Sequence, residues 1–296
     1  MKMNNRQFLG SENEFAQWER AKYVILPVPY EGAVSYGHGT ASAPDALLDA
    51  SEYLEFYDEV LKCCPHQVGI VTAEPTPIST DHARMHQIVF EKTNDILQHH
   101  KIPVLVGGDH SISSGAFRAF YEKYGSISCI QIDAHGDLRH QYEKSIYSHA
   151  SVLARIREMT PHTLQIGIRS MSIEEAETIS KEQMMVCTMH DYRRRLFPLD
   201  DALSKLPDPV YLTFDVDAMD WSVVASTGTP EPGGFYWDEM MDLLEKIFTC
   251  KQVIGFDMVE LSTSANDRNS PFAAAKLLYK MIAFSSFYGK EFSGRL

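Results

Sequence analysis

Short apolar runs alternate along the chain with longer segments whose apolar residues recur at helical spacing. The segment 82–99, for example, carries Met85, Ile88 and Ile96 on one helical face. This alternation is typical of a parallel β-sheet whose strands are joined by helices. We expect strands at 23–29, 104–106, 127–133, 164–168, 210–215 and 253–259. We expect helices from Pro44 onward and at 82–99, 114–124, 149–159, 173–183, 237–248 and 271–284. No repeat or linker interrupts the pattern, so residues 1–296 are predicted to form a single domain.

The most distinctive stretch follows the apolar run 127–132, where Asp133, His135 and Asp137 occupy alternate positions. Alternate side chains of an extended backbone point to the same side. If the chain stays extended past Asp133, two carboxylates and an imidazole therefore meet at one spot. Crowded carboxylates raise one another's pKa values, and a divalent cation relieves their repulsion. For this motif alone, a polar loop whose charges face water remains an alternative.

Further candidate ligands lie where other predicted strands end. These are His110, Asp215, Asp217 and Glu260. Ligands of open parallel sheets bind outside the carboxyl ends of the strands. Taken singly, His110 also fits a helix cap or a core position, and the Asp215/Asp217 pair is a weak signal. Together, the strand ends supply four aspartates, two histidines and a glutamate, which we interpret as a metal site.

The charge of the chain narrows the choice of partner. With 27 basic and 40 acidic residues, the net charge at pH 7 is −13. Such a surface repels nucleic acid and anionic membranes and attracts cations. No apolar run approaches the roughly 18 residues that span a bilayer, and residues 1–17 lack the apolar core of a signal peptide. We therefore expect a cytoplasmic protein. Its five cysteines have no disulfide or zinc spacing and are expected to be reduced packing residues, with Cys63 and Cys64, near a surface turn before Pro65, as the candidate exceptions.

Five motifs together carry a family resemblance: G-G-D-H-S-I at 107–112, D-A-H-G-D at 133–137, Ser148-His149, F-D-V-D-A-M-D at 214–220 and T-G-T-P-E-P-G-G at 227–234. In this order and at these separations, they look like the ureohydrolase family of arginases, agmatinases and formimidoylglutamases. The match covers nearly the whole chain, which looks most similar to agmatinases. The resemblance implies one arginase-like α/β/α domain, in which a mainly parallel central sheet carries helices on both faces.

The resemblance also implies two Mn²⁺ ions per chain. One ion would be held by His110, Asp133, Asp137 and Asp215, and the other by His135, Asp133, Asp215 and Asp217. Carboxylates with a minority of imidazoles suit Mn²⁺ better than a thiolate-seeking metal. Two such ions about 3.5–4 Å apart can lower the pKa of a water molecule held between them, so that a bridging hydroxide becomes available near neutral pH.

Two more residues receive catalytic roles by the same resemblance. His149 would protonate the leaving amine, and the near-neutral pKa of an ordinary histidine suits proton transfer. Glu260 would pair with the guanidinium and hold its carbon over the hydroxide. On the sequence alone, His149 would be interpreted as a helix-start histidine in a polar loop, and Glu260 as a solvated acid at a strand end.

The expected reaction is hydrolysis of agmatine, a small cationic guanidino compound, to urea and putrescine. Other guanidino or formimino hydrolases are alternatives: arginase, guanidinobutyrase, aminopropylagmatine ureohydrolase and formimidoylglutamase. A catalytically weak, metal-holding interaction protein of the same fold is another, and so is a deacetylase-like hydrolase with one metal on a related fold. Family members commonly form trimers or hexamers, which predicts a homo-oligomer.

The chain departs from the family pattern next to the expected entrance. Trp221 stands at a common proline, Ala225 and Ser226 replace a common Pro-Gly, and Ala150 replaces a glycine. None of the expected metal ligands is replaced, so these departures concern the substrate tail more than the chemistry. Candidates to meet a tail carboxylate are Arg139, Gln141, Ser145 and Ser148, and Glu143 is a candidate to meet an amine.

Overall fold

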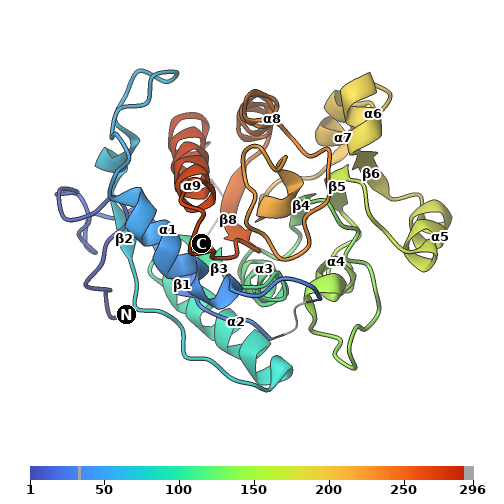
Figure 1. Ribbon diagram of the computed structural model, residues 1–296, viewed down its shortest axis with the longest axis horizontal. Helices are drawn as coiled ribbons and strands as arrows, with labels where there is room; N and C mark the ends of the chain where they lie inside the picture. The colour runs from blue at the N-terminus through green and yellow to red at the C-terminus, as the bar shows by residue number, and fades with distance from the viewer. Residues whose placement is uncertain (33–34, 290–296) are drawn as a thin grey trace.

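The computed structural model describes residues 1–32 and 35–289, and within them one sheet of eight parallel strands forms the centre of the molecule (Figure 1). The strand order is β2-β1-β3-β8-β7-β4-β5-β6. The strands are β1 Tyr23–Val28, β2 Ile70–Thr72, β3 Ile102–Gly107, β4 Ser128–Ile132, β5 Thr163–Ile168, β6 Met185–Thr188, β7 Val210–Asp215 and β8 Val253–Val259. Residues 33–34 and 290–296 of the predicted single domain lie outside the described residues.

Helices cover both faces of this sheet (Figure 1). One face carries α2 (His82–Gln98), α3 (Ile112–Tyr124) and α4 (Val152–Arg157). The other carries α1 (Ala43–Ser51), α8 (Trp237–Cys250) and α9 (Asn269–Tyr288). Near the β6 edge lie α5 (Ile173–Glu182), α6 (Met189–Arg194) and α7 (Leu199–Lys205). Alternate side chains of β1 enter different cores: Ile25 packs in the core under α1 and α9, and Val24 in the core under α2 and α3. The predicted α/β/α fold is confirmed.

The outermost elements differ from the prediction. The pattern does not predict the edge strands β2 and β6, which have three and four residues. Segments this short carry too few residues to show a periodicity. The short helices α6 and α7 were not predicted for the same reason. The predicted helix 149–159 is divided into a 3-10 turn at His149–Ser151 and the α-helix Val152–Arg157.

The central strands explain why polar residues at their ends stand out. Every residue of β4, β7 and β8 is buried, and most of them are apolar. A polar side chain inside such a strand must find a partner there. Gln131, Thr213 and Asp257 are polar residues within these strands, and all are fully buried. Each of them contributes to the hydrogen-bond network behind the candidate metal centre.

The structure bears on the predictions about the cysteines and about membrane-spanning segments. All five cysteines are free, and Cys129 and Cys187 are buried. Cys250 is exposed at the end of α8, so its predicted packing role is wrong. Within residues 1–32 and 35–289, no helix combines the length and the apolar character needed to cross a membrane.

Candidate metal centre

A cavity of about 230 Å³ lies at the carboxyl ends of β3, β4, β7 and β8. Its walls include most of the residues singled out in the sequence: His110, His135, Asp137, His149, Asp215, Asp217 and Glu260. Asp133 is fully buried and contacts both His110 and His135. Residues from five separate segments of the chain are thus brought together at one edge of the sheet, where a parallel sheet places its ligands.

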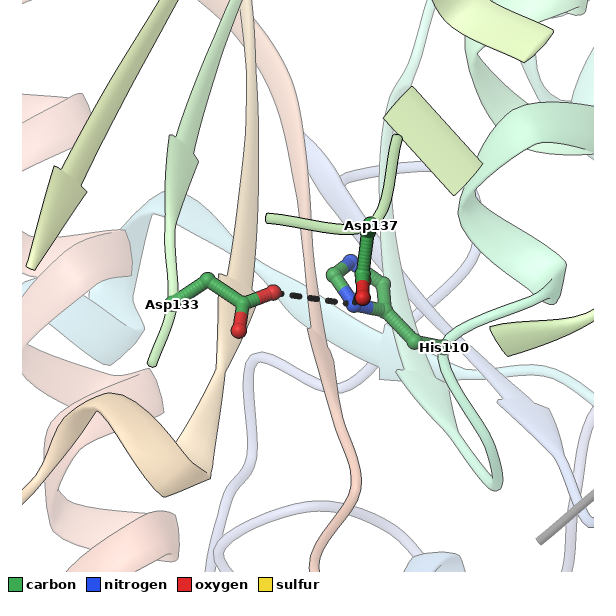
Figure 2. Close-up of side chains that lie close together, drawn as sticks. All are labelled: His110, Asp133 and Asp137. Carbon is green, nitrogen blue, oxygen red and sulfur yellow. Dashed lines mark ion pairs between the residues drawn. The ribbon is translucent and has the colours of Figure 1, made fainter. Parts of the chain in front are cut away.

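The first cluster of the centre consists of His110, Asp133 and Asp137 (Figure 2). Nδ1 of His110 lies 3.1 Å from Oδ2 of Asp133 and 2.9 Å from Oδ2 of Asp137. Oδ2 of Asp215 is a third neighbour at 3.4 Å. This nitrogen is buried and has no hydrogen bond of acceptable geometry to the described residues. A buried nitrogen that faces three carboxylate oxygens in this way fits coordination of a cation.

The second cluster consists of His135, Asp217 and again Asp133. Nδ1 of His135 lies 2.8 Å from Oδ2 of Asp217 and 3.7 Å from Oδ1 of Asp133. Asp133 therefore directs one oxygen toward each cluster. Asp215, the second expected bridge, directs Oδ2 toward His110, and its Oδ1 accepts the backbone N–H of Asp217 at 2.8 Å. Two adjacent sites with a shared carboxylate are the arrangement that a metal pair requires.

The side chains of Asp133, His135 and Asp137 do not all meet at one spot, which corrects the expectation based on an extended backbone. That expectation depended on an extended backbone, but β4 ends at Ile132 and Asp137 has a left-handed φ of 50°. The turn directs Asp137 toward His110, whereas His135 faces Asp217. The motif therefore contributes to two clusters instead of one.

Buried amides hold the acidic side chains in place. Nε2 of Gln131 donates to Oδ2 of Asp133 at 2.7 Å. Gln165 donates both to Oε1 of Gln131 at 3.0 Å and to the carbonyl of Gly136 at 2.8 Å. From the other side, the backbone N–H of Ala134 donates to Asp217 at 3.0 Å. These contacts fix the orientation of the carboxylates before any ion binds.

The charges of the centre strongly perturb its titration. Burial alone would lower the pKa of His110, but the three carboxylates around Nδ1 raise it well above 6.5. Burial also opposes the charged form of His135, and its contact with Asp217 outweighs this effect and raises the pKa to about 10. Burial and the charge of Asp133 raise the pKa of Asp137 to about 7. Without metal, the clusters therefore retain protons that a divalent cation would displace.

His149 lines the same cavity and contacts a residue from the segment between β1 and α1. Its Nε2 lies 2.8 Å from Oγ of Ser35, which is 114 positions away in the chain and also donates to the hydroxyl of Tyr142 at 3.3 Å. The edge of one ring faces the other in the His149–Tyr142 pair, with 5.5 Å between centroids. Sequence reasoning singled out neither Ser35 nor Tyr142 as a partner of His149. No periodicity or spacing signal connects either residue to His149.

Glu260 enters the centre directly after β8, on a left-handed backbone with φ of 63°. Its Oε1 accepts the backbone N–H of His110 at 2.7 Å. Burial and the charge of Asp109 raise its pKa well above 4.5 in the metal-free protein, so its expected ionisation at neutral pH depends on positive charge that metal or substrate brings. A side chain at Gly228 would crowd it, because a Cβ there would lie 3.2 Å from Oε2.

The residues proposed for the substrate tail divide into two groups. Arg139 lines the cavity, whereas Gln141, Glu143, Ser145 and Ser148 are not among its described lining residues. In the segment expected to border the entrance, Trp221 is 52% exposed. The backbone N–H groups of Ala225 and Ser226 both donate to Oγ of Ser270, at 2.9 and 3.1 Å, which ties this loop to the start of α9.

The chain is similar to known proteins in both sequence and fold. The sequence profile of the Arginase family matches residues 21–283. An N(1)-aminopropylagmatine ureohydrolase from Synechocystis sp. is 36% identical over 287 residues, which cover 94% of each chain. An agmatinase from Pyrococcus horikoshii is 32% identical and covers 90% of this chain and 93% of its own. The crystal structure of agmatine ureohydrolase of Thermoplasma volcanium has a TM-score of 0.84 at 28% identity, over 96% of this chain and 95% of that chain. The chain therefore belongs to the arginase family and is a hydrolase of the ureohydrolase type.

Proposed function

We propose that the protein is a two-manganese hydrolase that cleaves the guanidino group of a linear cationic amine to urea and a smaller amine. The observation that carries this proposal is the pair of Asp/His clusters that share Asp133 beside one cavity. Two Mn²⁺ ions would be held by His110, Asp133, His135, Asp137, Asp215 and Asp217. This donor set of carboxylates and imidazoles contains no thiolate, which suits Mn²⁺.

When bound, two divalent cations would activate water as a nucleophile and balance the crowded carboxylates. The residues of the chain would do the rest. Glu260 would accept N–H groups of the guanidinium and orient its carbon for attack. His149 would supply a proton to the leaving amine, which otherwise would have to depart as an amide anion. Ser35, in contact with Nε2 of His149, would hold that imidazole toward the cavity.

The cavity suits a cationic substrate. Its described walls contain five acidic side chains, and Arg139 is the only lysine or arginine among them. The net charge of −13 adds a long-range attraction for cations. A guanidinium with an ammonium tail therefore fits better than a guanidino acid.

The choice of tail depends on the relatives. The sequence motifs favour agmatine, but four relatives that are 32–37% identical to this chain are N(1)-aminopropylagmatine ureohydrolases. The agmatinase from Pyrococcus horikoshii is 32% identical. Both compounds present the same guanidinium and differ in an aminopropyl extension of the tail. We propose N(1)-aminopropylagmatine as the preferred substrate and agmatine as the second.

Urea release after removal of metal and readdition of Mn²⁺ tests the proposal. The panel comprises N(1)-aminopropylagmatine, agmatine, guanidinobutyrate, arginine and formiminoglutamate, the last assayed by formamide release. We expect manganese-dependent turnover of the first two, with the highest kcat/KM for N(1)-aminopropylagmatine. A preference for arginine or formiminoglutamate would contradict the proposal that the substrate has a cationic tail. No turnover of any compound would support the interaction protein, and one zinc per active chain would support the single-metal alternative.

The expected assembly and location remain predictions. A trimer or hexamer is expected from the family resemblance, and a cytoplasmic location from the composition. Sedimentation velocity of the purified protein would check the first: a monomer at micromolar concentration would contradict it.

A further inference from the structure

Behind His110, on the side away from Asp133 and Asp137, lies a chain of buried polar residues. Nε2 of His110 is 2.9 Å from Oγ1 of Thr213, and Oγ1 of Thr213 is 2.7 Å from Oδ1 of Asp257. Thr213 on β7 and Asp257 on β8 are register partners in the sheet. Both side chains are fully buried, and only 1% of the surface of His110 is exposed. Polar groups at such depth are retained only where they have partners.

The direction of these hydrogen bonds follows from counting donors. Asp257 accepts the hydroxyl of Tyr211 on Oδ2 at 2.6 Å and the backbone N–H of Phe214 on Oδ1 at 3.2 Å. A carboxylate accepts all of its neighbours, whereas a neutral acid would have to direct its own hydrogen at one of these donors. The single hydrogen of Thr213 therefore points to Asp257. Oγ of Ser113 also lies 3.2 Å from Thr213, but the shorter bond to a charged acceptor is stronger.

Because its hydrogen is directed at Asp257, Oγ1 of Thr213 must be the acceptor in its hydrogen bond with Nε2 of His110. The hydrogen of the neutral imidazole then lies on Nε2, and the lone pair lies on Nδ1, the atom that faces Asp133 and Asp137. A neutral histidine binds a metal through the nitrogen that carries no hydrogen, and the partner of the other nitrogen determines which one that is.

We propose that Thr213 and Asp257 are positioning residues that hold His110 as an Nδ1 metal ligand. This inference rests on the proposed function, because it concerns a ligand of the proposed metal pair. The second histidine provides an internal reference. Nε2 of His135 faces Oε1 of Glu231 at 3.9 Å, and the His135 side chain is 23% exposed. A change at Thr213 should therefore weaken the ion at His110 and leave the ion at His135.

The test compares manganese binding by chelator-stripped variants, measured by calorimetric titration and by metal analysis after dialysis. Thr213→Val keeps the shape of the side chain and removes its hydroxyl, and we expect one of the two sites to weaken by about 10–100-fold. Thr213→Ser restores the hydroxyl and should bind both ions as the wild type does. Ser113→Ala is the matched control, because it removes a neighbouring hydroxyl that contacts Thr213 and Asp257 and leaves the Thr213–Asp257 and Thr213–His110 bonds in place.

The melting temperature of each metal-free variant shows whether it is folded. If Thr213→Val does not fold, Thr213→Ala removes the hydroxyl without placing a methyl group against Asp257 and should weaken the same site. Wild-type binding of both ions by the folded variant, equal weakening of both sites, or no recovery in Thr213→Ser would each overturn the inference. Failure of the wild type to bind two ions would instead contradict the proposed function, and this is measured before any variant is compared.

Discussion

Two acidic residues of the centre, Asp137 and Glu260, have left-handed backbones with φ of 50° and 63°. Residues other than glycine seldom adopt this conformation, which costs on the order of 1–3 kcal/mol. At Glu260 the backbone is held on both sides: its N–H donates to the carbonyl of Gly108 at 2.9 Å, and its carbonyl accepts from Oγ1 of Thr227 at 2.9 Å. The backbone geometry thus fixes the direction in which each acidic side chain leaves the main chain.

Glu260→Gln tests whether this residue recognises charge. The amide oxygen of glutamine can still accept the N–H of His110, so both metals should remain bound. The variant loses the ionic pair with the guanidinium, and kcat/KM should fall by about 10²-fold, because such hydrogen bonds are worth roughly 1.5–3 kcal/mol and misorientation adds to the loss. Glu177→Gln, on an exposed residue of α5 outside the cavity walls, is the control. A normal kcat/KM would remove Glu260 from the mechanism, and loss of metal would make it a ligand.

His149→Asn tests proton transfer. Metal content should stay at the wild-type level while kcat falls by roughly 10²–10⁴, the usual effect of a lost acid/base group. Asp217→Asn, by contrast, should deplete one ion, because it removes a carboxylate that faces His135 at 2.8 Å. His140→Asn controls for changes in the same exposed loop. Unchanged kcat in the first variant, or equal metal loss in the first two, would contradict the assigned roles.

At the scale of elements, α2 supports the loop that precedes His149. The ring of His86 on α2 packs against Tyr147 with 4.5 Å between centroids. Burial, together with the nearby charge of Arg118, lowers the pKa of His86 to about 4. The imidazole is therefore neutral near pH 7, and protonation would place a charge between a helix and the loop that leads to the cavity.

His86 should make the protein sensitive to acid. Between its ordinary pKa of 6.5 and about 4, the unfolded chain binds a proton that the folded protein does not. Stability is thus fully present above pH 6.5 and is lost as the pH falls through about 4, by roughly 2–4 kcal/mol. Urea unfolding of metal-free protein at pH 7 and pH 4.5 should show a smaller loss for His86→Gln than for the wild type. The exposed His190→Gln should behave as the wild type, and an equal loss in both variants would contradict the role of His86.

The predictable elements are those whose residues share one environment. The strands β1, β3, β4, β5, β7 and β8 were predicted because consecutive apolar residues are buried on both faces of the sheet. Edge strands β2 and β6 are three and four residues long, and their pairing depends on neighbours distant in sequence. Tertiary contacts therefore define the edges of this sheet, and local pattern defines its centre.

The same distinction between local pattern and tertiary contacts applies to the candidate metal centre. His110, Asp215 and Glu260 stand out because a polar residue at or just past the end of a buried strand lies at the edge where ligands bind. The division of Asp133, His135 and Asp137 into two clusters depends on a left-handed turn that the pattern does not reveal. Supporting residues such as Thr213 are harder still, because their role exists only through contacts with neighbouring strands.

For the whole molecule, the metal-free protein concentrates negative charge in its interior. Asp133, Asp137, Asp215 and Asp217 lie together and account for four of the 40 acidic residues in a chain whose net charge is −13. Such a group is unfavourable unless protons or cations compensate it. The protein should therefore exchange protons for metal as the pH rises, and its global stability should report that exchange.

The difference in melting temperature between manganese-loaded and chelator-treated protein should increase from pH 5 to pH 8. In the metal-free state, Asp137 has a pKa of about 7 against an ordinary 3.8, and His135 about 10 against 6.5. In both windows the folded chain holds protons that the unfolded chain has released, so metal-free stability falls as the pH rises. Metal binding displaces these protons, so the affinity of the protein for metal increases with pH. The manganese-loaded form therefore gains stability as the pH rises. Scanning calorimetry at each pH measures both forms. Metal-free Asp137→Asn should lose the part of the slope between about pH 4 and 7, and a pH-independent difference in the wild type would show that these groups do not bind the metal.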